Sequence, residues 1–125
     1  MLNLSLVALG GAIGAALRHL ANLLALRLVG PNFPWGTLAI NVVGSLAMGL
    51  FVGLLARRFG GSTELRLFVA TGILGGFTTF SAFSLDFATL WERGATFSAF
   101  GYAFASVITA ILALFLGMWL ARSIG

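Results

Sequence analysis

The stretch from Gly72 to Ser84 is GILGGFTTFSAFS, and it lies inside a longer apolar segment, residues 67–91. Adjacent glycines, two β-branched threonines and several hydroxyls are poor material for an unbroken helix. In lipid, a break in a helix frees backbone carbonyls that protein or an ion must then satisfy. The stretch therefore predicts a transmembrane helix that breaks near Gly75–Thr79 and is buried at a subunit interface. The alternative is an intact helix whose glycines form an ordinary packing groove.

The rest of the chain is equally apolar. Of its 125 residues 60% are hydrophobic and 8% are charged, and the mean hydropathy is +1.09. Charged residues make up about a quarter of a soluble domain, whereas a membrane span needs about 20 apolar residues. The composition therefore predicts an all-α membrane protein, a single domain over residues 1–125, with four spans at about residues 4–28, 36–55, 67–91 and 96–121. The first apolar run is too long for a signal peptide, so we interpret it as a retained span.

Small residues recur at four-residue intervals in every span, for example Gly10 and Gly14 in the first and Gly72 and Gly76 in the third. Such faces allow the backbones of two helices to approach closely in lipid. We therefore expect several tight helix contacts, some of them between subunits.

The charged residues bear on membrane orientation. The chain has seven arginines, no lysine and three acidic residues, and the arginines mostly flank apolar runs, which favours interfacial anchoring over nucleic-acid binding. Four spans place both termini on one side, which has four arginines, while the other side has two or three. This bias is too weak to fix an orientation. A single topology and insertion in both directions, which would allow an antiparallel homodimer, both stay open.

Most of the polar side chains inside the spans are uncharged. Phe80 and Phe83 share one helix face, and the positive edges of their rings can stabilise a small anion, although phenylalanines that fill a core or face lipid are the alternative. Asn41 can donate two hydrogen bonds or simply join two helices. An anion that sheds its water needs such donors, and the candidates are Asn41, Thr79, Ser81, Tyr102 and Ser106. Free carbonyls at the break suit a hard cation.

Three motifs follow one another along the chain: GGAIGAALR at 10–18, GTLAINVVGS at 36–45 and GGFTTFSAFS at 75–84. With these motifs the whole chain resembles the CrcB/Fluc family of fluoride channels. The resemblance implies an antiparallel, dual-topology homodimer with two pores in a prokaryotic cell membrane. The sequence has Ala82 where the family more often has threonine, so the line of hydroxyls is shorter here.

The resemblance also implies roles for residues of the pore. Phe80 and Phe83 would form an aromatic box, and Asn41 would donate hydrogen bonds to the ion. Tyr102 and Ser106 match pore positions of the family's fourth helix. These expectations coincide with the donors selected above from the residues alone.

Two further sites are implied by the resemblance. Gly75 and Thr78 would provide backbone carbonyls to a structural Na⁺ at the dimer interface, and Arg18 would attract anions at an aqueous vestibule. Asp86, an acid well inside a span, is interpreted as a partner at a helix end or as part of a vestibule.

We therefore expect a passive, fluoride-selective channel that releases cytoplasmic fluoride and reduces its toxicity. A proton-coupled exporter would need a carboxylate deep in the first span, which has none. A purely structural subunit would not need polar residues on three helices. An enzyme is not expected, because the single histidine, His19, has no credible catalytic partner in the sequence.

Overall fold

The computed structural model describes residues 1–58 and 60–124, and the regular structure within these ranges is helical. The elements are α1 (Leu2–Val29), α2 (Trp35–Arg58), α3 (Thr63–Leu65), the π-helix η1 (Arg66–Leu74), α4 (Gly75–Phe77), α5 (Ser81–Glu92) and α6 (Thr96–Ile124). With α3 to α5 taken as one interrupted segment, four helices in the described part of the chain are long and apolar enough to cross a membrane. The predicted all-α membrane architecture is confirmed at this level.

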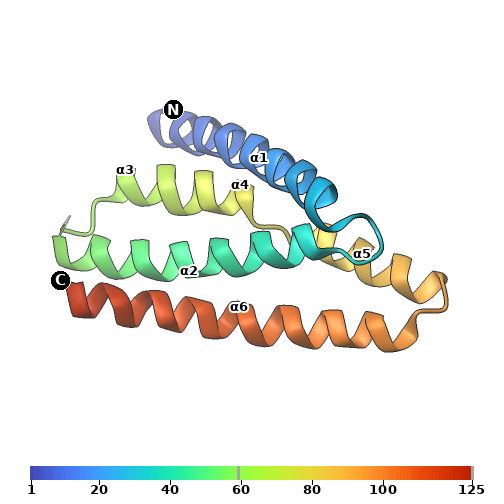
Figure 1. Cartoon of the computed structure of the whole chain (residues 1–125). Helices are drawn as coiled ribbons and strands as arrows, with labels where there is room; N and C mark the ends of the chain where they lie inside the picture. The colour runs from blue at the N-terminus through green and yellow to red at the C-terminus, as the bar shows by residue number, and fades with distance from the viewer. Residues whose placement is uncertain (59, 125) are drawn as a thin grey trace.

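The helices lie side by side with α2 in the middle (Figure 1). α6 runs along one side of α2, while α1 crosses over η1 and α4 on the other side. Glycines allow these close contacts, because a Cβ atom on Gly14 would collide with the carbonyl oxygen of Ile73 in η1. In the same way, a Cβ on Gly49 of α2 would collide with the carbonyl oxygen of Leu114 in α6. The small-residue faces found in the sequence thus join helices within one chain.

The third long segment is interrupted, but further along the chain than the glycine pair. Both glycines belong to α4, and the backbone leaves the helix at Thr78, where φ is −81° and ψ is 158°. Gly76 is the place where α1 approaches, since a Cβ there would lie 2.7 Å from the carbonyl oxygen of Gly11. The break expected near Gly75–Thr79 is therefore confirmed at Thr78 and Thr79, and its bounds are corrected, because the non-helical residues are 78–80. The glycines allow packing against α1, and the β-branched threonines carry the non-helical turn.

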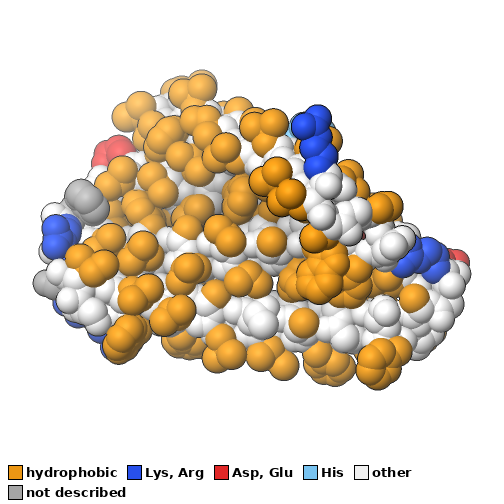
Figure 2. All heavy atoms as spheres, in the orientation of Figure 1, with side chains coloured by type: hydrophobic (Ala, Val, Ile, Leu, Met, Phe, Trp, Pro, Cys, Tyr) orange, Lys and Arg blue, Asp and Glu red, His pale blue; other side chains and the backbone are white. Residues whose placement is uncertain are grey.

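The surface of a single chain is dominated by apolar side chains. Figure 2 shows hydrophobic side chains spread over the length of the helices, while most basic and acidic side chains on this face lie toward the two ends. Several large apolar side chains in mid-helix are more than half exposed, including Phe104 at 64% and Phe115 at 59%. A surface of this kind is suited to lipid or to another apolar chain.

Candidate functional site

Asn41 of α2 is bound to the backbone at the break. Its Nδ2 donates to the carbonyl of Thr79 at 2.9 Å, and its Oδ1 accepts from the N–H of the same residue at 2.8 Å. The side-chain amide therefore satisfies both backbone groups of Thr79, as a neighbouring peptide would in a sheet. Because the segment cannot use water within a bilayer, this pair of bonds is what makes a non-helical residue acceptable at this depth.

The break also frees carbonyls in the preceding turn. In a continuous helix the N–H groups of residues 79–82 would bond to the carbonyls of residues 75–78. Here the N–H of Thr79 bonds to Asn41, and the N–H of Ala82 bonds to Oγ1 of Thr79 at 3.1 Å. The carbonyls of Gly75 and Thr78 consequently lose their regular helical donors. A hard cation prefers oxygens of this type.

Arg18 compensates for the break from the opposite side. It lies in α1, is partly buried, and its Nε donates to the carbonyl of Gly76 at 3.2 Å. A charged donor makes a stronger hydrogen bond than a neutral one, so this contact ties α1 to the end of α4. The arginine predicted for a vestibule thus also has a direct structural contact at the break.

Three aromatic rings follow one another from the break toward α6. The centroids of Phe80 and Phe83 are 5.5 Å apart at an interplanar angle of 42°, and those of Phe83 and Tyr102 are 5.2 Å apart at 37°. These tilted arrangements are within the usual range for aromatic pairs. Phe80 is 76% exposed, whereas Tyr102 is fully buried, so the row of rings runs from the surface of the chain into its interior.

A hollow of about 260 Å³ lies beside these rings. Its lining residues are Asn41, Ser45, Thr78, Thr79, Phe80, Phe83, Ser106, Val107 and Ala110. Within the described residues, Oγ of Ser106 is buried and has no hydrogen-bond partner. A buried hydroxyl without a partner is costly, which marks this wall of the hollow as a place where a further acceptor would be stabilised.

The structure brings together most, but not all, of the residues selected from the sequence. Asn41, Thr79, Phe80, Phe83 and Ser106 line one hollow. Tyr102 is outside it and adjoins it through the ring of Phe83. Ser81 is exposed and lies 3.3 Å from Oγ1 of Thr79, so it contacts a lining residue without lining the hollow.

Sequence reasoning missed the partner of Asp86. The hydroxyl of Tyr102 donates to Oδ2 of Asp86 at 3.0 Å, which joins α6 to α5. This differs from pairing at a helix end, the first of the two interpretations of Asp86. The signal that was available is the depth of both residues in apolar segments, where an acid needs a partner.

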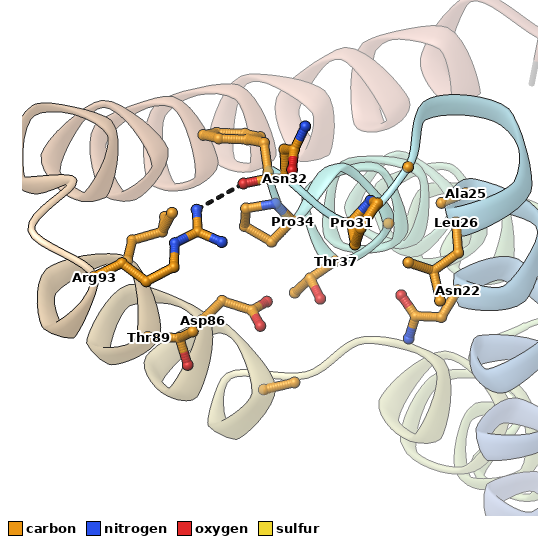
Figure 3. A pocket seen from close by; sticks show the side chains of 15 residues that line it. Asn22, Ala25, Leu26, Pro31, Asn32, Pro34, Thr37, Asp86, Thr89 and Arg93 are labelled. Atoms are coloured by element: carbon orange, nitrogen blue, oxygen red, sulfur yellow. Dashed lines mark hydrogen bonds between the residues drawn. The ribbon is translucent and has the colours of Figure 1, made fainter.

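A second hollow, of about 330 Å³, lies where α1 and α5 end. Figure 3 shows Asp86, Arg93, Thr37 and Asn22 arranged around it. The interpretation of Asp86 as part of a vestibule agrees with its place in the lining of this cavity. The other lining residues could not be assigned from the sequence, because the cavity depends on how the connection after α1 lies against α5.

Comparison with known proteins shows the family to which the chain belongs. The family model described as "CrcB-like protein, Camphor Resistance (CrcB)" matches residues 5–118. The chain belongs to the CrcB family. A family member from Mesorhizobium japonicum is 77% identical over 124 residues, and one from Chelativorans sp. is 64% identical over 124 residues. Each alignment covers 99% of both chains, and both relatives are named "Fluoride-specific ion channel FluC". Membership of this family, together with the four helices within residues 1–58 and 60–124 that are long and apolar enough to cross a membrane, identifies a multi-pass cell-membrane protein.

Proposed function

We propose that this CrcB protein is a passive, fluoride-selective channel that lets cytoplasmic fluoride leave the cell and so reduces its toxicity. The observation that carries the proposal is the hollow between Asn41, Phe83 and Ser106, where hydrogen-bond donors and aromatic rings occur together in apolar segments. The names of its close relatives support the same ion.

The lining suits a small anion that has lost its water. Asn41 uses one N–H of its amide for Thr79, and a primary amide has a second N–H to offer. The unpartnered hydroxyl of Ser106 is another donor, and the edges of Phe80 and Phe83 carry partial positive charge. Fluoride accepts stronger hydrogen bonds than larger halides, so such a lining favours it without a fixed positive charge. No catalytic step is required.

A structural Na⁺ is part of the proposal. The carbonyls of Gly75 and Thr78 fit this ion, because the bonds made by Thr79 and Ala82 leave both without regular helical donors. Gly75 is also exposed on the surface of the single chain. A cation held there by two chains would supply the charge that the freed carbonyls need, and it would tie the subunits together.

The second structural part of the proposal is an antiparallel homodimer with two pores. Phe80 lines the hollow, yet it is largely exposed in one chain, so the aromatic wall is incomplete without a neighbour. Another copy inserted in the opposite direction would cover it. In this arrangement Arg18, which contacts the end of α4, would line an aqueous vestibule and attract anions.

The decisive experiment measures ion flux from liposomes that contain the purified protein. We expect fluoride to leave at least about a hundredfold faster than chloride, because the hydrogen bonds that replace hydration differ by a few kcal/mol between the ions. The flux should persist with no proton gradient, and protein-free liposomes should retain fluoride. Similar rates for chloride and fluoride would contradict the proposal, as would a flux that requires a proton gradient.

A further inference from the structure

The second hollow opens at the end of the bundle where α1 and α5 finish, and it contains two opposite charges. Its polar lining residues include Asn22, Asn32, Thr37, Asp86, Thr89 and Arg93. Figure 3 shows the guanidinium of Arg93 and the carboxylate of Asp86 on the same side of the cavity, with Asn22 across from them. The cavity is large enough for several water molecules and is open to the surface.

Each of the two charged groups is held in place by a separate contact. Arg93 donates from an Nη atom to the carbonyl of Asn32 at 2.8 Å (Figure 3). Asp86 accepts from the hydroxyl of Tyr102 at 3.0 Å. A guanidinium has five N–H donors in a planar fork, so one bond to a carbonyl leaves donors for an anion. The contact with Asn32 also fixes the connection between α1 and α2 at the rim of the cavity.

This cavity adjoins the first hollow, which is part of the proposed pore. Asp86 is bonded to Tyr102, whose ring packs against Phe83, and Phe83 lines the first hollow. Thr37 of the second hollow lies one helical turn before Asn41 of the first. The two hollows therefore lie on either side of the Phe83–Tyr102 ring pair.

An anion that approaches the rings from this end meets the carboxylate of Asp86. Like charges repel strongly in a cavity with low-dielectric walls. The positive charge of Arg93 lies on the same cavity and offsets that repulsion, so the lining carries one charge of each sign. Without Arg93 the lining would have a net negative charge.

From this arrangement we propose that the second hollow is a binding site for a small hydrated anion at the mouth of the pore, and that Arg93 binds the anion there. The inference rests on the proposed channel function for its physiological role. It assigns to Arg93 the task of bringing the anion past Asp86 to the aromatic rings.

The first test compares fluoride flux through three variants in liposomes at low ionic strength. Arg93→Gln should lower the flux by about tenfold, the lower end of what a focused field does to the local concentration of an ion. Arg93→Lys keeps the charge and should stay near the wild-type rate. Arg27→Gln is the matched control, because Arg27 is exposed in the last turn of α1 at the same end of the molecule but does not line the cavity.

Ionic strength separates an electrostatic role from a structural one. With an impermeant salt at 1 M the Debye length falls to about 3 Å, so the deficit of Arg93→Gln should become much smaller. A wild-type rate for Arg93→Gln at low salt would overturn the inference. So would an equal loss in Arg27→Gln, or a loss in Arg93→Lys as large as that in Arg93→Gln and insensitive to salt, because the residue would then only hold the Asn32 connection.

A second measurement does not depend on conduction. Crystals of the wild-type protein and of Arg93→Gln are soaked in bromide, and the ion is located by anomalous scattering. We expect a peak beside Arg93 in the wild type and none there in the variant. A wild-type cavity without bromide would overturn the inference even in a conducting protein. A wild-type protein that passes no fluoride but holds bromide beside Arg93 would instead contradict only the proposed channel function.

Discussion

Asn41 reaches the backbone of the broken segment with both ends of its side-chain amide. Each such hydrogen bond contributes about 0.5–1.5 kcal/mol net, and leaving the two groups of Thr79 unpaired in lipid would cost more. The sequence left two interpretations of Asn41, a helix-joining amide or an ion donor. The structure shows the first, and the remaining N–H of the same group is the donor of the proposed pore. Asn41 thus satisfies the backbone at the break and also lines the hollow beside it.

Phe83 lines the first hollow and belongs to the ring pair that separates it from the second, so its replacement tests the aromatic wall directly. It packs against both Phe80 and Tyr102. A contact with an aromatic ring is worth about 0.5–1.5 kcal/mol, and 1.4 kcal/mol is about a factor of ten in rate. We expect Phe83→Ile to lower fluoride flux from liposomes by roughly tenfold or more, because isoleucine fills similar space without a positive edge.

The matched control is Phe104→Ile, which changes an exposed phenylalanine of α6 that does not line the hollow. This variant should conduct fluoride like the wild type. Size-exclusion chromatography should give the same assembly for both variants. Unchanged flux in Phe83→Ile, with the assembly intact, would remove the ring edges from the mechanism.

For individual residues, the sequence predicted which ones belong to the site better than it predicted their contacts. The sequence identified Asn41 and Ser106 because polar side chains in apolar segments need hydrogen-bond partners. It identified Phe80 and Phe83 because the two rings share one helix face. Their partners lie on other helices, and the spacing along one chain does not determine which backbone group a side chain reaches. For this reason the contact between Arg93 and Asn32 could not be predicted, and the depth of Asp86 indicated that it has a partner but not that the partner is Tyr102.

Among the elements, the interrupted third segment shows what governs a break in lipid. Helix propensity is weak at the glycine pair and at the two threonines that follow it, and the sequence therefore placed the break within Gly75–Thr79. In the structure Gly76 is helical and packs against Gly11 of α1, because close packing between helices outweighs intrinsic propensity. The break occurs instead where Asn41 and Arg18 can satisfy the freed backbone groups. The number and class of the helices follow from apolar length alone, but the location of the break depends on neighbouring helices.

The contact between α1 and η1 provides a stability prediction with an internal control. A methyl group on Gly14 would collide with the carbonyl of Ile73, whereas one on Gly11, a turn earlier in the same helix, would meet nothing within 4 Å. We expect Gly14→Ala to lower the free energy of unfolding by about 1–3 kcal/mol, the usual cost of overpacking. Gly11→Ala should change it by about 0.5 kcal/mol or less. Thermal unfolding in one detergent measures both, and equal stabilities would contradict the packing described here.

A single chain leaves several functional groups exposed on its surface. Phe80 and Ser81 are exposed at the break, as is Gly75 on the turn before it. In a bilayer these groups would contact acyl chains, and a freed carbonyl there would be costly. A second copy is the simplest cover, and the weak bias of the arginines permits that copy to insert in the opposite direction. One geometric and one electrostatic feature therefore support the proposed antiparallel dimer.

Orientation can be measured with single cysteines, because the natural chain has none. Gly61 and Gly94 are exposed in connections at opposite ends of the bundle. In cells treated with a membrane-impermeant maleimide, dual topology predicts that Gly61→Cys and Gly94→Cys are each labelled in about half of the chains, since neither end has the arginine excess that fixes orientation. A single topology predicts full labelling of one variant and none of the other. That second result would exclude the antiparallel dimer, because two chains facing the same way cannot be related by an axis in the membrane plane.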